Sequence, residues 1–425
     1  MSIPKLDWKF TQVFGDKSTA CSVADEDVIS AMSFDTTGNY LSLGDKAGRL
    51  IIFQRNPNKN KKGGVEFQYF AELQSHMREF DYLKSADIEE KINAIQWLRP
   101  VGKNMFVVTT NDKTIKLWKL SDKQVKKSEL TNKKAQSEAD LKIPKLKTID
   151  DGVNPVLKRA FPNLHNYHIN SVSVSANGEN IISSDDLKIY IWDLENSKTA
   201  YNIVDLKPDN FEELSEVITS SQFHPTNDCQ FIYSSSKGII KMGDLRQRSN
   251  CDNGVLTIED KESTSQKNFF TDIVASISDI TYSSDGRYIF SRDFLNVKVW
   301  DVNMPKKPIN TIPIFEPLKS KLCELYENEG IFDKFNISVS KDAKYFMTGL
   351  FNSNFHISDR NGENNNQFEL NFDRKTIVKH IPKKFYEPLG SKYDYTRKVL
   401  KGVWHPTENL VAMACLNCLY FYHIP

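Results

Sequence analysis

The strongest constraint on the fold is a pattern of short strands that recurs seven times along the 425 residues. Each copy has a β-rich strand, a polar turn, a second apolar strand, a short polar loop and a third apolar strand. The first strands contain Ser33-Phe34-Asp35, Gln96-Trp97-Leu98, Ser173-Val174-Ser175, Gln222-Phe223-His224, Thr281-Tyr282-Ser283, Ser338-Val339-Ser340 and Val403-Trp404-His405. The third strands span residues 50–53, 115–118, 189–192, 239–242, 297–300, 355–358 and 419–422. Such a repeat predicts one repetitive all-β architecture.

Sheets of this size must stack to be stable, because a four-stranded blade cannot bury both of its faces alone. Asp follows Trp192 and Trp300 directly, as in WD repeats. We therefore predict an all-β fold in which residues 1–425 form a single seven-bladed WD-repeat β-propeller. Residues 8–14 precede the first copy and are expected to form the outer strand of the last blade, closing the ring. Two stacked β-sandwiches are the alternative, which the seven copies disfavour.

Composition argues against several classes of partner. The 56 Lys and Arg residues nearly balance the 55 Asp and Glu residues, so no global charge drives the chain toward nucleic acid or membrane. The amino terminus lacks the apolar core of a signal peptide, and no stretch approaches the roughly 18 to 20 apolar residues that span a bilayer. The 6 cysteines are scattered and fit a reducing compartment. We expect a soluble protein of the cytoplasm, with the nucleus as a second compartment.

Residues that would carry catalysis or bind metal do not form a complete set. Cys415 and Cys418 have zinc-like spacing without a second pair, and His165 and His168 lack a third ligand. His224-Pro225 and His405-Pro406 occupy equivalent turns of their repeats, which favours a structural role. The sequence shows no phosphate-binding glycine loop, nucleophile elbow or kinase signature. We therefore expect no enzymatic activity, no metal and no cofactor.

The copies are separated by more than the roughly 40 to 45 residues of a compact WD repeat. We interpret residues 55–64, 121–159, 247–268 and 361–391 as insertions, and the second of these is rich in Lys. Insertions of this length are either solvated loops or ordered segments that bind partners.

Antiparallel strands place successive connections at alternate ends of the propeller. The turns between first and second strands share one end, the bottom, with the 121–159 insertion. The other end, the top, collects the loops between second and third strands and the segments that enter each first strand. Its acidic clusters are Asp25-Glu26-Asp27, Asp87 with Glu89 and Glu90, Asp185-Asp186, and Glu212-Glu213 with Glu216, alongside Lys46 and Lys91. They predict either a binding surface for basic partners or ordinary loop solubility.

The segment 208–217 on the same face is predicted to form a short helix, with Asn210 as N-cap and Glu213 three residues later. Such a helix sets Phe211, Leu214 and Val217 among carboxylates. These three side chains form either a mixed apolar and acidic recognition surface or a packing contact with the ring.

Long strings outside the repeat pattern carry a family resemblance. They span residues 79–85, 88–93, 110–118, 167–171, 202–205, 233–238, 320–328 and 331–335. These strings resemble the B-type WD-repeat regulatory subunits of serine/threonine protein phosphatase type 2A, and the match covers nearly the whole chain. The resemblance implies a heterotrimer with a phosphatase catalytic subunit and a helical-repeat scaffold subunit. A WD-repeat scaffold of another assembly is the alternative, and a propeller enzyme is a third reading.

The resemblance also implies specific site residues. It implies an acidic top-face groove for phosphoprotein substrates with basic segments, at Glu26, Lys46, Glu89, Glu90, Lys91, His168 and Asp186. It implies an adjacent apolar and acidic helix that carries Phe211, Glu212, Leu214 and Val217. The 121–159 insertion would be a protruding β-hairpin that binds the scaffold, with Leu141, Ile143, Pro144 and Leu146 on its best-matching strand.

Overall fold

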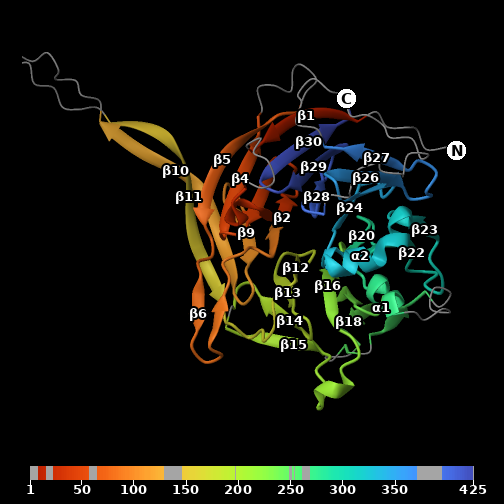
Figure 1. Cartoon of the computed structure of the whole chain (residues 1–425). Helices are drawn as coiled ribbons and strands as arrows, with labels where there is room; N and C mark the ends of the chain where they lie inside the picture. The colour runs from red at the N-terminus through yellow and green to blue at the C-terminus, as the bar shows by residue number, and fades with distance from the viewer. Residues whose placement is uncertain are drawn as a thin grey trace, which may run out of the picture.

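The computed structural model describes residues 8–15, 23–56, 65–128, 146–196, 198–247, 251–252, 254–260, 269–370 and 395–424, with side chains excepted at 122–128 and 146–152. Within these ranges, seven antiparallel four-stranded sheets are arranged as the blades of a ring (Figure 1). Contacts between innermost strands run from each blade to the next and return from the last blade to the first. The predicted seven-bladed propeller is confirmed.

Each blade contains four strands, named below in order from the centre outward. Blade 1 has β2 (Ile29–Phe34), β3 (Tyr40–Asp45), β4 (Arg49–Arg55) and β5 (Phe67–Gln74); blade 2 has β8 (Ala94–Trp97), β9 (Met105–Thr110), β10 (Ile115–Ser128) and β11 (Leu146–Phe161). Blade 3 has β12 (Ser171–Val174), β13 (Asn180–Ser184), β14 (Lys188–Asp193) and β15 (Ala200–Asp205); blade 4 has β16 (Ile218–Phe223), β17 (Gln230–Ser235), β18 (Ile240–Asp244) and β19 (Leu256–Ile258).

The remaining blades follow the same order. Blade 5 has β20 (Asp279–Tyr282), β21 (Tyr288–Arg292), β22 (Asn296–Asp301) and β23 (Asn310–Pro313); blade 6 has β24 (Ile337–Val339), β25 (Tyr345–Gly349), β26 (Asn354–Asp359) and β27 (Asn366–Glu369). Blade 7 has β28 (Lys401–Trp404), β29 (Leu410–Cys415), β30 (Cys418–His423) and β1 (Lys9–Phe14). The connections hold the β6–β7 hairpin (Glu79–Asp81, Ala86–Ile88), the helices α1 (Phe269–Ala275) and α2 (Leu322–Glu327), and the 3-10 turns η2 (Asp25–Asp27), η5 (Phe211–Glu213), η7 (Glu316–Lys321) and η8 (Gly330–Phe332).

The amino-terminal strand closes the ring, as expected. Strand β1 pairs antiparallel with β30, so the outermost strand of blade 7 comes from the opposite end of the chain. Trp8 is buried and meets Trp404 edge-on, with ring centroids 5.3 Å apart. Phe67 of blade 1 stacks on Phe421 of blade 7 at 4.8 Å. Apolar contacts therefore hold the seam that the strand exchange creates.

Three of the four proposed insertions contain the fourth strand of a blade, so their interpretation as extra segments was partly wrong. Residues 154–159 of the second insertion belong to β11 and pair with β10, while β19 lies inside the 247–268 segment and β27 inside the 361–391 segment. The outermost strand of a blade packs against the sheet on one side only, so its sequence lacks the apolar pattern of the inner strands.

Polar side chains at the top of the innermost strands join each blade to the next. The contacts from blade 1 through blade 7 are Ser30 Oγ to the Ile92 carbonyl, Asn93 Nδ2 to Ile169, Asn170 Nδ2 to Ile218, Ser220 Oγ to the Asp279 carboxylate, the Ile337 N–H to Asp279, and Asn336 Nδ2 to Gly402. The Ile29 N–H donates to the Leu416 carbonyl and completes the circle. These bonds fix the radius at which the strands surround the axis.

Histidines fix two seams between blades on the bottom face. His405 Nε2 donates to the Gly38 carbonyl at 2.9 Å, and its Nδ1 accepts from the backbone N–H groups of Thr407 and Glu408. Gly38 has φ of +78°, and a Cβ there would lie 2.1 Å from His405 Nε2. His224 makes the equivalent contacts within its own turn and lies against Gly286 of blade 5. The structural role expected for both His-Pro turns is confirmed.

We expect the propeller to lose stability below about pH 6.5. Burial lowers the pKa of His405 and of His224, and it lowers the pKa of His76 to about 3. The unfolded chain therefore takes up protons before the folded chain, and the free energy of unfolding falls as the pH drops. Each histidine that stays neutral contributes a loss of about 1.4 kcal/mol between pH 7.5 and 5.5. Urea unfolding at pH 7.5 and at pH 5.5 measures the loss of unfolding free energy, and His76→Gln should make that loss smaller. An unfolding free energy that is the same at both pH values would contradict the prediction.

Candidate functional site

The candidate site lies on the top face of blades 1 to 4. The first acidic group is η2, where Lys46 pairs with Asp25 at 2.6 Å and Arg49 pairs with Asp27 at 2.6 Å. Glu26 is exposed between them, and its carbonyl accepts from the Ala47 N–H at 3.0 Å. The basic side chains of blade 1 thus partly neutralise η2 and leave the Glu26 carboxylate facing solvent.

The second acidic group, residues 89–91, is in direct contact with the first. Gly48 in the β3–β4 loop has φ of +78°, and a Cβ there would lie 2.7 Å from the Glu90 carbonyl oxygen. Glu89 is exposed, whereas Glu90 and Lys91 are half-buried. The glycine lets the loop of blade 1 approach the segment that enters blade 2, so Glu26, Glu89 and Glu90 share one part of the face.

Asp112 connects this group to blade 3, and sequence reasoning missed it. One of its carboxylate oxygens accepts from Asn93 Nδ2 at 2.8 Å, and the other lies 3.0 Å from Nδ1 of the exposed His168. The neighbouring Asn111 donates from Nδ2 to the Glu89 carbonyl at 3.0 Å. Asp112 lies in the string 110–118, which carries part of the family resemblance, but the sequence does not show that the β9–β10 loop reaches His168.

The two aspartates of the third acidic group play different roles. Asp185 is fully buried, and its carboxylate contacts His165 Nδ1 at 2.9 Å and the N–H groups of Leu187 and Lys188. Burial works to raise the pKa of Asp185, but these hydrogen bonds hold it below its ordinary value. The assignment of Asp185 to the acidic surface is therefore wrong, because a WD-repeat loop needs this carboxylate to cap its own turn.

Asp186 is half-buried, less exposed than we expected. Burial raises the pKa of Asp186, against the opposing attraction of Lys334 and His168. Its carbonyl accepts from the Ile218 N–H at 2.7 Å, which fixes the aspartate beside the first strand of blade 4. Its carboxylate forms no hydrogen bond or ion pair of contact distance with the part of the chain that the structure describes.

The segment 208–217 forms only the single 3-10 turn η5, so the longer helix was a wrong prediction. The N-cap is right, because the Asn210 side chain accepts from the Glu212 N–H at 3.2 Å. Leu214 already has extended backbone angles, so the helical hydrogen bonding ends after one turn. Phe211 is 52% exposed and Leu214 is 36% exposed, while Val217 is half-buried. Phe211 and Leu214 therefore do not pack into the ring.

Exposed aromatic side chains continue this surface toward blade 5. The ring centroid of Phe269 in α1 lies 5.7 Å from that of Tyr326 in α2, and the Tyr326 centroid lies 5.8 Å from that of Phe332 in η8. Figure 1 shows α1 and α2 on the same side of the ring. A cavity of about 660 Å³ between these elements and blade 4 includes Ser215 in its wall. Sequence reasoning missed this cluster, since exposed and buried aromatic residues look alike in a sequence.

A long β-hairpin projects from blade 2. Strands β10 and β11 continue past the ring, pairing from Ser121 with Asn154 out to Ser128 with Leu146 (Figure 1). Leu141, Ile143 and Pro144 lie outside the described residues, and only the backbone of Leu146 is described. The hairpin itself is confirmed, whereas the residues proposed to bind a scaffold stay a prediction.

The described ranges hold no cluster of metal-binding side chains. No three His, Cys, Asp or Glu side chains there lie close enough together to hold an ion. His165 is engaged by Asp185 and by Ser183, whose hydroxyl lies 2.7 Å from Nε2. Cys415 and Cys418 face each other across the β29–β30 turn. The described helices include none with the length and apolar character needed to cross a bilayer.

The ring of blades and the Trp-Asp strand ends define the chain as a WD-repeat β-propeller protein, and the family model "WD domain, G-beta repeat" matches residues 160–193. The chain is 43% identical to the regulatory B subunit of protein phosphatase PP2A from Schizosaccharomyces pombe, over 98% of this chain and 97% of that protein. It is 42% identical to the PP2A 55 kDa regulatory subunit of Drosophila melanogaster, over 98% and 86%.

A third relative, a serine/threonine-protein phosphatase 2A regulatory subunit of Dictyostelium discoideum, is 41% identical over 98% of both chains. The chain belongs to the family of regulatory B subunits of protein phosphatase 2A. Its role is accordingly regulatory and not catalytic.

Proposed function

We propose that this protein recruits phosphoprotein substrates with basic segments to a phosphatase catalytic subunit, within a heterotrimer that a helical-repeat scaffold subunit holds together. The catalytic subunit removes phosphate from serine or threonine, while the propeller holds the basic flank of the substrate on its top face. The family membership supports association with the phosphatase core. We place this assembly in the cytoplasm and also in the nucleus.

The observation that carries the proposal is the surroundings of Asp186. A half-buried carboxylate without a contacting cation attracts Lys or Arg more strongly than an exposed one, because less water screens it. The exposed Phe211 and Leu214 lie on the segment that leads into β16, whose first residue is bonded to Asp186. A segment with a basic residue flanked by apolar ones fits this combination.

The acidic residues of blades 1 and 2 extend the same surface. Glu26 and Glu89 are exposed, and His168 is held beside Asp112. Charges spread over several loops steer a basic segment toward the face and orient it, even where each single contact is weak. The hairpin, which projects away from the blades, is the proposed scaffold-binding arm.

Purification of the tagged full-length chain from cell extract tests the proposal. We expect a phosphatase catalytic subunit and a helical-repeat subunit to co-purify, and the complex to dephosphorylate a basic-flanked phosphoprotein faster than the same protein with the flank neutralised. The isolated chain should show no turnover. Co-purification with an unrelated assembly, without phosphatase activity, would support the alternative role as a WD-repeat scaffold.

A further inference from the structure

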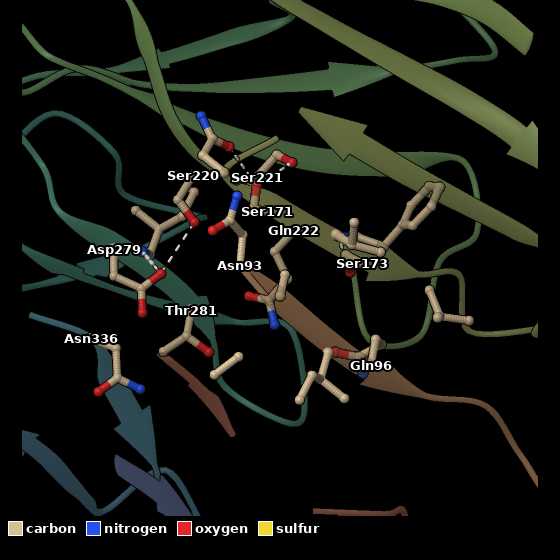
Figure 2. A pocket seen from close by; sticks show the side chains of 18 of the residues that line it. Asn93, Gln96, Ser171, Ser173, Ser220, Ser221, Gln222, Asp279, Thr281 and Asn336 are labelled. Atoms are coloured by element: carbon tan, nitrogen blue, oxygen red, sulfur yellow. Dashed lines mark hydrogen bonds between the residues drawn. The ribbon is translucent and has the colours of Figure 1, made fainter. Parts of the chain in front are cut away.

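A polar cavity of about 540 Å³ lies on the axis of the propeller. Figure 2 shows side chains from several blades around it, among them Asn93, Gln96, Asp279 and Asn336. The volume is within the range of pockets that bind small molecules. Polar side chains of the cavity wall that bond one blade to the next serve the fold, so a charged side chain of the wall without such a bond is a candidate for binding a ligand.

Most polar groups in the cavity wall are committed to joining blades. Asp279 accepts from Ser220 Oγ and from the N–H groups of Ile280 and Ile337. Asn336 exchanges two hydrogen bonds with the backbone of Gly402, at 2.7 and 2.9 Å. These side chains hold the ring and leave little capacity for a ligand.

Lys401 differs from them. It is the first residue of the innermost strand β28, it lines the cavity, and it is half-buried. Its ammonium group forms no hydrogen bond or ion pair of contact distance with any residue that the structure describes. The Asp279 carboxylate attracts the Lys401 ammonium group without contacting it, and this carboxylate already accepts three hydrogen bonds.

Two further lysines raise the positive charge at this end of the cavity. Lys91 and Lys334 both lie close enough to repel the charge on Lys401, and Lys334 also lines the cavity. Burial and this repulsion lower the pKa of Lys401. Lys401 and Lys334 thus add two ammonium groups to the cavity lining, whose carboxylate at this end is that of Asp279. A bound dianion would satisfy a charge arrangement that the protein leaves uncompensated.

We propose that the upper mouth of the axial cavity binds the phosphate group of a small molecule. Lys401 contacts the phosphate from inside the channel, and Lys91 and Lys334 contact it from the rim. The cavity is larger than a single phosphate ion, so it has room for the remainder of a small phosphate monoester below the charged mouth. This site goes beyond substrate recruitment and is tested on the isolated full-length chain, independently of that role.

Isothermal titration with inorganic phosphate, and separately with glycerol 3-phosphate, tests the site at constant ionic strength, with chloride as the control anion. We expect both phosphates to bind and Lys401→Met to weaken them by about tenfold or more, because it removes the innermost charge-assisted contact. Lys334→Gln, at an exposed position, should weaken binding about threefold through the loss of one partly screened charge. Lys198→Met, in the exposed turn between β14 and β15, is the matched control.

Circular dichroism establishes that each variant is folded before titration. Absence of phosphate binding to the wild-type chain overturns the proposal. Equal binding to the wild type, Lys401→Met and Lys334→Gln also overturns it, because phosphate would then bind elsewhere. Binding of inorganic phosphate alone would restrict the ligand to the free ion and reject the monoester.

Discussion

Replacing Asp186 with lysine is expected to lower the dephosphorylation of a basic-flanked phosphoprotein more than tenfold in the assembled trimer. Loss of a charge-assisted contact costs roughly 1.5 to 3 kcal/mol, and repulsion from the new ammonium group adds to it. The new charge would also join Lys334, His168 and Lys113, the cations that already act on this position. The comparison needs three measurements: scaffold binding, dephosphorylation of a small phosphopeptide without a basic flank, and dephosphorylation of the basic-flanked protein.

Only the third measurement should fall. The Asp186 carboxylate contacts no described group directly, and the bond from the Ile218 N–H to its carbonyl survives the substitution. Asp186→Asn removes the charge without adding repulsion, so its effect should be smaller and in the same direction. Glu195→Lys makes the same charge change in an exposed turn on the bottom face and serves as the control. Higher salt should narrow the difference between wild type and Asp186→Lys.

Equal loss on both substrates would mean that Asp186→Lys damages assembly or catalysis. Unchanged activity on both would remove Asp186 from the recognition surface. The dephosphorylation rates of the basic-flanked protein therefore distinguish two effects. A loss in Asp186→Lys and Asp186→Asn but not in Glu195→Lys indicates local recognition at Asp186, whereas an equal loss in Glu195→Lys indicates a long-range effect of charge.

The repeat in the sequence was sufficient to predict the ring, because the same succession of short strands and turns recurs seven times and the second strand of each blade is buried along most of its length. The strand exchange that closes the ring was also predictable, since residues 8–14 precede the first complete copy. The fourth strands were not, because β19 and β27 are short and their outer face is open to solvent. The pattern of apolar residues along a strand reflects which of its faces are buried. A strand that is buried on one face only therefore has fewer apolar positions and is harder to recognise in the sequence.

The candidate site was predictable in its location and less so in its chemistry. Antiparallel topology assigned the acidic loops to one end of the ring, but it does not distinguish Asp185, which caps its own turn, from the adjacent Asp186. Nothing in the local sequence indicates that Lys46 and Arg49 neutralise part of η2. Such pairings depend on contacts between residues more than twenty positions apart, which local patterns do not encode.

Removing residues 122–150 and joining the ends with a short Gly-Ser bridge is expected to abolish most scaffold binding and leave the propeller folded. Strand β10 pairs with β9 only over residues 115–120, and Ser121 lies opposite Asn154 at the base of the arm. The deletion therefore keeps every β9–β10 pair and the part of β11 that completes blade 2. If the arm makes the principal contact, scaffold affinity should fall by about 100-fold or more, ~2.7 kcal/mol.

Two further variants localise the contact. Replacing only residues 129–145 with a Gly-Ser turn keeps the paired stem, and it should cause most of the loss because Leu141, Ile143 and Pro144 lie in that segment. Replacing residues 57–64, which connect β4 to β5 in the sequence, is the matched control and should leave binding unchanged. Thermal unfolding should remain cooperative in all three variants, since none removes a blade strand. Unchanged assembly of the trimer with the 122–150 deletion would show that the scaffold binds another part of the bottom face, and the arm would need a different role.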